Sequence, residues 1–305
     1  MKLNPDRMLD RQRLKRGVVF WRLLAILALA ALIIVTIGHT VDGPASGNHI
    51  ARLWVTGLIY DYPGRGEALS EIARDENIEA VIVRINSPGG TMAGSEALFL
   101  GLRQIATQKP LVAVMDTTAA SGGYMAALAA ERIFARNSSV TGSIGVILQT
   151  ADVTKMLTDF GVATEAIKSA PLKGTPSPFE PLNEAGRAAS QALVDDMYAY
   201  FVDLLAKHRG LEPSEARAIS DGRVFTGRQA VKSGLIDEIG GEAEARRWLE
   251  SQRGISSTLR VYDLDLGEQE DIVERLVSSV GKSVLPRRLM LDGLLAVWHP
   301  GLGHR

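Results

Sequence analysis

The sequence predicts an α/β fold with a largely parallel sheet, preceded by a single N-terminal transmembrane helix. From residue 50 onward, short apolar runs alternate with helical segments, which is typical of parallel strands joined by crossover helices. Two small-residue turns follow predicted strands, at the carboxyl ends where functional sites gather in such folds. A basic segment followed by a long apolar stretch opens the chain and indicates a membrane anchor.

The N-terminal 49 residues divide into three parts. Residues 1–16 form a basic tail, residues 17–38 are almost wholly apolar, and residues 39–49 predict a short flexible linker. The positive-inside rule then places the tail in the cytoplasm and the rest of the chain outside it. A cleavable signal peptide is the alternative, but the apolar stretch is long for one, and Arg22 near its basic end can reach the headgroups.

The remaining chain predicts one main domain, residues 50–253, and an extension, residues 254–305, without a usable motif. Strands are expected at 50–59, 80–85, 111–115, 132–136, near the end of 137–148 and at 259–264. Helices are expected at 67–74, 93–107, after Ser121, and at 152–160, 183–209, 213–219, 226–233 and 242–252. Residues 163–167 are expected to be extended, and residues 173–181 irregular because they contain three prolines.

Composition excludes several classes of function. The 305 residues include no cysteine, so disulfides, thiol nucleophiles and cysteine-ligated metals are absent. A net charge of −1 gives no reason to expect nucleic acid as a partner. No HExxH motif or ligand cluster occurs, and neither phosphate-binding glycine motif is present. We therefore expect neither a metal nor another cofactor.

Ser121 stands where an apolar run gives way to an Ala-rich helix, and Gly122 and Gly123 follow it. Backbone N–H groups at a helix start are unpaired and favour negative charge, and the glycines let a substrate backbone approach. These are the needs of a serine nucleophile. Taken alone, the stretch is explained more simply by Ser121 as a helix N-cap.

A second small-residue segment, residues 86–90, follows a buried strand and precedes a helix. Its last two residues, Gly89 and Gly90, can present N–H groups to an anionic oxygen, as an oxyanion hole does. An ordinary turn between a strand and a helix is the alternative.

A serine nucleophile needs a base. The five histidines lie in the linker, in the C-terminal tail or at a polar helix end, and read as solvated residues, which disfavours a Ser-His-Asp triad. Lysine serves as a base only when it is neutral, and hence desolvated. Lys173 and Lys168 both lie in segments with few competing charges, and composition does not choose between them.

Five separated motifs occur in an order that resembles the signal peptide peptidase A family, peptidase family S49. These are membrane-anchored Ser-Lys proteases with a crotonase/ClpP-like fold of repeated β-β-α units. The motifs are NSPGG at 86–90, ASGGY at 120–124, TGSIGV at 141–146, the segment 173–179, and SDGRVFTGRQAVKSGLIDEIGG at 220–241.

The resemblance implies roles for individual residues. Ser121 corresponds to the nucleophile and Lys173 to the general base, because the family lysine is followed five and six residues later by a Pro-Phe pair, here Pro178 and Phe179. Lys168 lacks this pair.

Three further positions carry over from the family. Ser143 corresponds to the serine that hydrogen-bonds the base lysine. Gly122 and either Gly89 or Gly90 correspond to the oxyanion donors.

The resemblance also implies a setting. It predicts a single-pass protein of the bacterial inner membrane whose catalytic domain, residues 50–253, lies outside the cytoplasm and degrades remnant signal peptides and other apolar peptides. It further predicts a homo-oligomer in which neighbouring protomers share each site. The alternatives are a crotonase-type acyl-CoA enzyme and a non-catalytic membrane scaffold of the same fold. A Ser-His protease of the caseinolytic type is disfavoured because no histidine occurs between Ser121 and His208.

Overall fold

The computed structural model describes residues 21–22, 24–27, 47–264, 266 and 294–297. The chain divides into two units, residues 1–47 and 48–305. In the first unit, residues 21–22 and 24–27 are helical. None of the described helices has the length and apolar character needed to cross a bilayer. The predicted tail and most of the predicted anchor lie outside the described residues, so the anchor stays a prediction.

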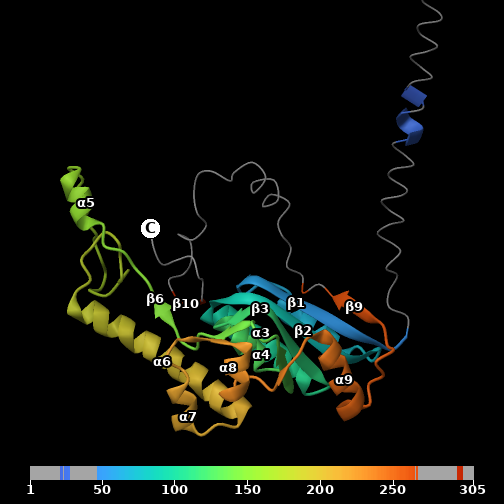
Figure 1. Ribbon diagram of the computed structural model, residues 1–305. Coiled ribbons are helices and arrows are strands. Elements are labelled where there is room, and N and C mark those ends of the chain that lie inside the picture. Colours follow the sequence, from blue (N-terminus) through green and yellow to red (C-terminus); the bar gives the residue numbers. More distant parts are fainter. Residues whose placement is uncertain (1–20, 23, 28–46, 265, 267–293, 298–305) are drawn as a thin grey trace, which may run out of the picture. The chain divides into compact units, whose positions relative to one another are not determined.

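The described part of the second unit is built on one ten-stranded sheet (Figure 1). Its strands are β1 (His49–Ile59), β2 (Ile78–Thr91), β3 (Leu111–Ala120), β4 (Arg132–Ala135), β5 (Val140–Gly142), β6 (Ile147–Leu148), β7 (Val224–Thr226), β8 (Glu238–Ile239), β9 (Val261–Leu264) and β10 (Leu294–Val297). Strands β9, β1, β2, β3, β4 and β8 run parallel in that order. The predicted α/β class with a largely parallel sheet is confirmed.

Helices cover both faces of this sheet. They are α2 (Arg65–Arg74), α3 (Met92–Ala106), α4 (Gly122–Ala127), α5 (Thr154–Asp159), α6 (Glu184–Arg209), α7 (Pro213–Ala218), α8 (Gly227–Lys232) and α9 (Glu242–Arg253). On one face, Leu102 of α3, Tyr124 of α4 and Phe201 of α6 join the larger core. On the other face, Leu249 of α9 packs with Ile82 and its neighbours. Alternate residues of each strand point to opposite faces, so apolar runs such as 81–85 serve both layers.

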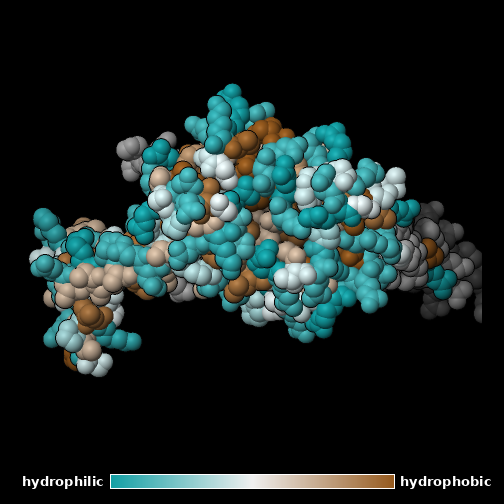
Figure 2. Space-filling model, turned by 90° about the horizontal axis from the view of Figure 1, so that it is seen from below, coloured by the Kyte–Doolittle hydropathy of each residue, from teal (hydrophilic) through white to brown (hydrophobic). Residues whose placement is uncertain are grey.

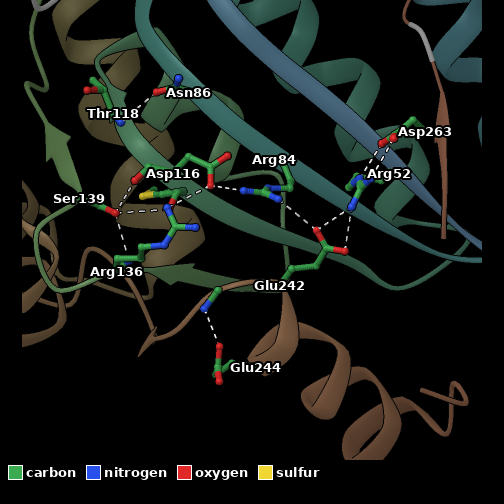
Figure 3. Close-up of polar contacts among 12 residues, drawn as sticks. Arg52, Arg84, Asn86, Asp116, Thr118, Arg136, Ser139, Glu242, Glu244 and Asp263 are labelled. Carbon is green, nitrogen blue, oxygen red and sulfur yellow. Dashed lines mark hydrogen bonds and ion pairs between the residues drawn. The ribbon is translucent and has the colours of Figure 1, made fainter. Parts of the chain in front are cut away.

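Beside α9, the sheet face carries a chain of ion pairs (Figure 3). Arg52 of β1 binds Glu242 of α9 at 3.0 Å and Asp263 of β9 at 2.6 Å. Arg84 of β2 contacts the same Glu242 and also Asp116 of β3. Since each partly buried charge has opposite charges beside it, the cluster ties α9 and β9 to the central strands without leaving an unpaired ion.

The alternative interpretation of residues 86–90 as an ordinary turn between a strand and a helix is wrong. Strand β2 continues to Thr91 and pairs with the end of β1 through Leu58↔Gly89 and Ile59↔Gly90. A methyl group on Gly90 would lie 1.8 Å from the Ile59 carbonyl oxygen. The glycine therefore allows two backbones to approach closely rather than a chain reversal.

Most other predicted elements are confirmed within a few residues. Helix α6 begins after the Asn183 cap and ends at Gly210, as the sequence predicts. The sequence does not predict strands β7 and β8, and residues 163–167 form no strand. The extension beyond residue 253 supplies β9 and β10 to the sheet.

Residues 149–183, here called the arm, contain α5 and the irregular segment that was expected around the prolines. The arm lies at the N-terminal end of α6, apart from the sheet (Figure 1). Helix α6 enters the core only near its other end, at Phe201 and Leu205.

Candidate active site

Ser121 joins the end of β3 to the start of α4. Its backbone angles are φ 53° and ψ −118°, and its side chain makes no capping hydrogen bond to the helix. The residue is only 1% exposed. Its N–H donates to the Gly142 carbonyl at 2.8 Å, and its own carbonyl accepts from the Met125 N–H at 2.9 Å. The backbone is thus fixed on both sides while the hydroxyl is left uncommitted to the helix.

Ser143 lies directly beside Ser121 in the fold. It follows β5, which runs parallel to β3 with Ala120 opposite Gly142. Its N–H donates to the Arg223 carbonyl of the segment leading into β7, at 2.8 Å. Adjacent strands are about 4.8 Å apart, so the two serines leave neighbouring strand ends together.

These two serines share an uncommon backbone conformation. Ser121, with φ 53°, and Ser143, with φ 50°, are the non-glycine residues of positive φ in the described part of the chain. Such a conformation costs on the order of 1–3 kcal/mol and clusters at functional sites. The backbone strain therefore falls on the same two serines that the sequence motifs select.

The glycines expected to form an oxyanion hole meet at this point. Gly122 is the first residue of α4, so its N–H has no acceptor within the helix. A methyl group on Gly122 would lie 3.2 Å from the Gly90 nitrogen. The Gly89 N–H already donates to the Ser87 hydroxyl at 3.0 Å. Of the two alternatives left open by the sequence, the geometry therefore favours Gly90 as the second donor.

A strand docks at the edge of this site. The backbone of β10 pairs antiparallel with β2 from Gly89 to Thr91 and with β6 at Ile147 and Leu148. The gap between β2 and β6, next to the Ser121 turn, thus accepts an extended chain through main-chain pairing.

Lys173 is not brought to Ser121 by its own chain. It lies in the exposed segment that joins α5 to α6 (Figure 1). From Asn183 to Phe201 the helix rises about 27 Å, which separates this segment from the point where α6 enters the core. Within the described residues, the Lys173 ammonium makes no ion pair, whereas Lys168 pairs with Glu180. Of these two lysines, Lys173 is therefore the one whose amine is uncommitted within the described part of the chain.

The two histidines in the described part of the chain, His49 and His208, do not take its place. The expectation that His49 is a solvated linker residue is wrong, since it begins β1, is 3% exposed and packs edge-on against Tyr262. It stands at the amino end of a parallel strand, opposite the edge that bears Ser121. His208 packs edge-on against Phe99, and burial lowers its pKa. It is therefore not simply solvated either.

Three contributors to the site are not predicted by the sequence. The Ser87 hydroxyl donates to the Gly57 carbonyl at 2.6 Å and so holds the glycine segment against β1. The Arg223 carbonyl fixes Ser143, and Ser95 packs behind Gly122. The first lies within the NSPGG motif, but a backbone carbonyl and a helix residue carry no recognisable sequence signal.

Comparison with known proteins finds similarity to several proteins that are named as proteases. The model of peptidase family S49 matches residues 103–256. A protein of Synechocystis named as a protease, slr0021, is 36% identical over 68% of this chain and 75% of its own length. Another from Methanocaldococcus jannaschii, MJ0651, is 28% identical over 79% of this chain and 82% of its own. A protein of Enterococcus faecium named as signal peptide peptidase SppA is 30% identical over 72% and 67%.

Proposed function

Because this chain belongs to peptidase family S49, and so is a protease by family, we propose that it is a serine endopeptidase with a Ser121–Lys173 dyad. Its substrates are apolar peptides such as remnant signal peptides. The observation that carries the proposal is the pair of strained serines, Ser121 and Ser143, at neighbouring strand ends beside two glycines.

The reaction is acyl transfer through an ester intermediate. Neutral Lys173 takes the proton of the Ser121 hydroxyl, whose oxygen attacks the peptide carbonyl carbon. The N–H groups of Gly122 and Gly90 hold the resulting oxyanion. The C–N bond then breaks as the lysine ammonium protonates the leaving amine, and water hydrolyses the ester by the same proton route. Ser143 accepts a hydrogen bond from the lysine and orients it.

The substrate binds as an extended strand. The pairing of β10 with β2 and β6 supports this mode, since a peptide in the same gap presents its backbone to Gly89–Thr91 next to Ser121. Main-chain pairing recognises any extended chain, and apolar preference then depends on the side chains around the gap.

The lysine comes from a neighbouring protomer of a homo-oligomer. Two observations support this part of the proposal. Lys173 lies on the arm, away from its own Ser121, and large apolar side chains of the arm are exposed, including Phe160 and Ile167. A second copy that covers the arm would also remove water from the amine, which a basic lysine requires.

The fold is of the crotonase/ClpP-like kind, and the protein is anchored by residues 17–38 with its catalytic domain outside the cytoplasm. The basic tail and apolar stretch of the sequence support the anchor. An anchored protease would meet apolar peptides where they leave the bilayer.

Peptide hydrolysis by three variants of the full chain tests the dyad. Ser121→Ala and Lys173→Ala are expected to fold and to lose essentially all activity, by a factor on the order of 10⁴ or more. Lys168→Ala is the matched control, and it should retain activity because its amine is paired with Glu180. Hydrolysis that survives Ser121→Ala would reject the serine mechanism, and activity loss in Lys168→Ala alone would move the base.

A further inference from the structure

Ser95, in the first turns of α3, carries a buried hydroxyl without a partner. The residue is fully buried, and its Oγ has no hydrogen-bond partner in the described part of the chain. Buried hydroxyls in folded proteins are nearly always paired, so an unpaired one requires a reason. A serine at this helix position can bond back to the preceding turn, but this one does not.

The hydroxyl lies behind the two candidate oxyanion donors. A methyl group on Gly122 would lie 2.1 Å from Ser95 Oγ and 2.9 Å from its Cβ. The same point is 3.2 Å from the Gly90 nitrogen. Ser95 Oγ therefore occupies the space where α3 meets the start of α4, on the side of Gly122 that faces Gly90.

Alanine would satisfy the packing of α3 without burying an unpaired polar atom. The presence of a hydroxyl at this point thus indicates an electrostatic use. Helix α3 begins two residues after Gly90, so its positive end faces the same place. A hydroxyl bound to no acceptor can rotate its O–H dipole toward a negative charge that develops nearby.

We propose that Ser95 is a positioning residue for the oxyanion hole. Its oxygen sets the spacing between Gly122 and Gly90, and its O–H dipole turns toward the tetrahedral intermediate. This assignment rests on the proposed serine mechanism. Because the hydroxyl acts on the transition state and not on the bound peptide, its removal lowers kcat with little change in KM.

The test compares Ser95→Ala with wild type in the full chain. We expect kcat to fall about tenfold and KM to stay within about twofold. The affinity for a peptide boronate, which forms a tetrahedral adduct with Ser121, should fall by the same factor as kcat. Binding of an uncleaved peptide, measured in the Ser121→Ala background with and without Ser95→Ala, should be unchanged.

Ser220→Ala is the matched control. Ser220 is also a buried serine, but its hydroxyl already donates to the Ala216 carbonyl at 2.6 Å. Its replacement should lower Tm and leave kcat and boronate affinity unchanged, which is the signature of a structural role.

The two proposals fail in different ways. If Ser95→Ala keeps wild-type kcat and boronate affinity while Ser121→Ala is inactive, the Ser95 assignment is overturned and the serine mechanism stands. If Ser121→Ala still hydrolyses peptides, the mechanism itself is rejected. The ratio of boronate affinity to KM, both measured on the same variant, is independent of the folded fraction, so a loss of stability cannot mimic the expected result.

Discussion

The two halves of the proposed dyad lie in contrasting parts of the molecule. Ser121 is buried, strained and fixed by backbone hydrogen bonds to β5 and α4. Lys173 is exposed on the arm and forms no ion pair with a described residue. A strained conformation persists only where its surroundings determine it, whereas a basic lysine requires desolvation. The serine half of the proposed dyad is thus preorganised within one chain, and the lysine half would be desolvated only if a further surface covered it.

The exposed apolar side chains of the arm lead to the same conclusion. Ile167 is 97% exposed and Phe160 79% exposed. Figure 2 shows apolar surface on this projecting segment at the left. Large apolar side chains exposed on one segment indicate a contact surface. The arm is therefore expected to be covered in the active assembly, and its lysine with it.

The largest effect is expected from mixing two inactive variants. If each site takes its serine from one protomer and its lysine from the next, coexpressed Ser121→Ala and Lys173→Ala chains should recover about a quarter of wild-type activity, because half of each residue type is intact. Peptide hydrolysis by purified mixed assemblies measures this recovery. Each variant expressed alone should remain inactive.

An inactive mixture would show that the dyad forms within one chain. In that case no site of the mixed assembly holds both Ser121 and Lys173. That result would require the arm to fold back onto its own Ser121. A double variant, Ser121→Ala with Lys173→Ala, coexpressed with wild type controls for dilution of active chains.

A smaller effect is expected from replacing a glycine with alanine, once beside Ser121 and once in the arm. Gly122→Ala places a carbon 2.1 Å from Ser95 Oγ and 2.9 Å from its Cβ, so the hydroxyl must rotate away and α3 must shift relative to α4. We expect kcat to fall by a factor on the order of 10² because an oxyanion donor moves, and the free energy of unfolding to fall by about 1–3 kcal/mol. Steady-state kinetics and chemical denaturation measure the two effects.

Gly161→Ala in the arm is the control for this change. A methyl group there meets no atom within 4 Å, although φ is +71°. The expected loss is only about 1 kcal/mol of local strain, with kcat retained. Equal kinetic losses in both variants would contradict the view that the serine half is the tightly packed one.

The sequence alone predicts the serine half of the site better than its surroundings. The strand preceding Ser121, the helix after it and the neighbouring Ser143 motif follow from local composition and from the family pattern. The C-terminal extent of β2 cannot be predicted in this way, because the glycines at its end suggest a turn as long as the strand that pairs with them is unknown. Only the pairing of Gly90 with Ile59 shows that the residue is needed for close approach.

Long-range contacts explain the other differences. Strands β7 and β8 are two or three residues long and exist only through pairing with β5 and β4. The sequence predicts a solvated His49 because the residue is buried against Tyr262, which lies more than two hundred positions away along the chain. The conformation of Ser121 and the free hydroxyl of Ser95 are likewise properties of packing, which residue patterns do not encode.

The smallest expected effect is on the free energy of unfolding in acid, and it differs between the sheet that carries Ser121 and the arm. The hydrogen bond from Arg52 lowers the pKa of Asp263, and the Trp54 indole N–H also donates to this carboxylate, at 2.7 Å. A lowered folded-state pKa stabilises the protein above the unfolded pKa of about 3.9, and this contribution is lost as pH falls through the folded value. Asp263→Asn should therefore reduce the free energy of unfolding by about 0.5–1 kcal/mol at neutral pH, and progressively less in acid.

In the arm, hydrogen bonds from Thr154 lower the pKa of Asp152, but this group is fully exposed, so Asp152→Asn should leave global unfolding unchanged. Urea denaturation of both variants and wild type near pH 7 and pH 3 measures the difference. If Asp263→Asn lowers the free energy of unfolding as much in acid as at neutral pH, the asparagine perturbs packing. The ionised carboxylate is then not what stabilises the attachment of β9 to β1.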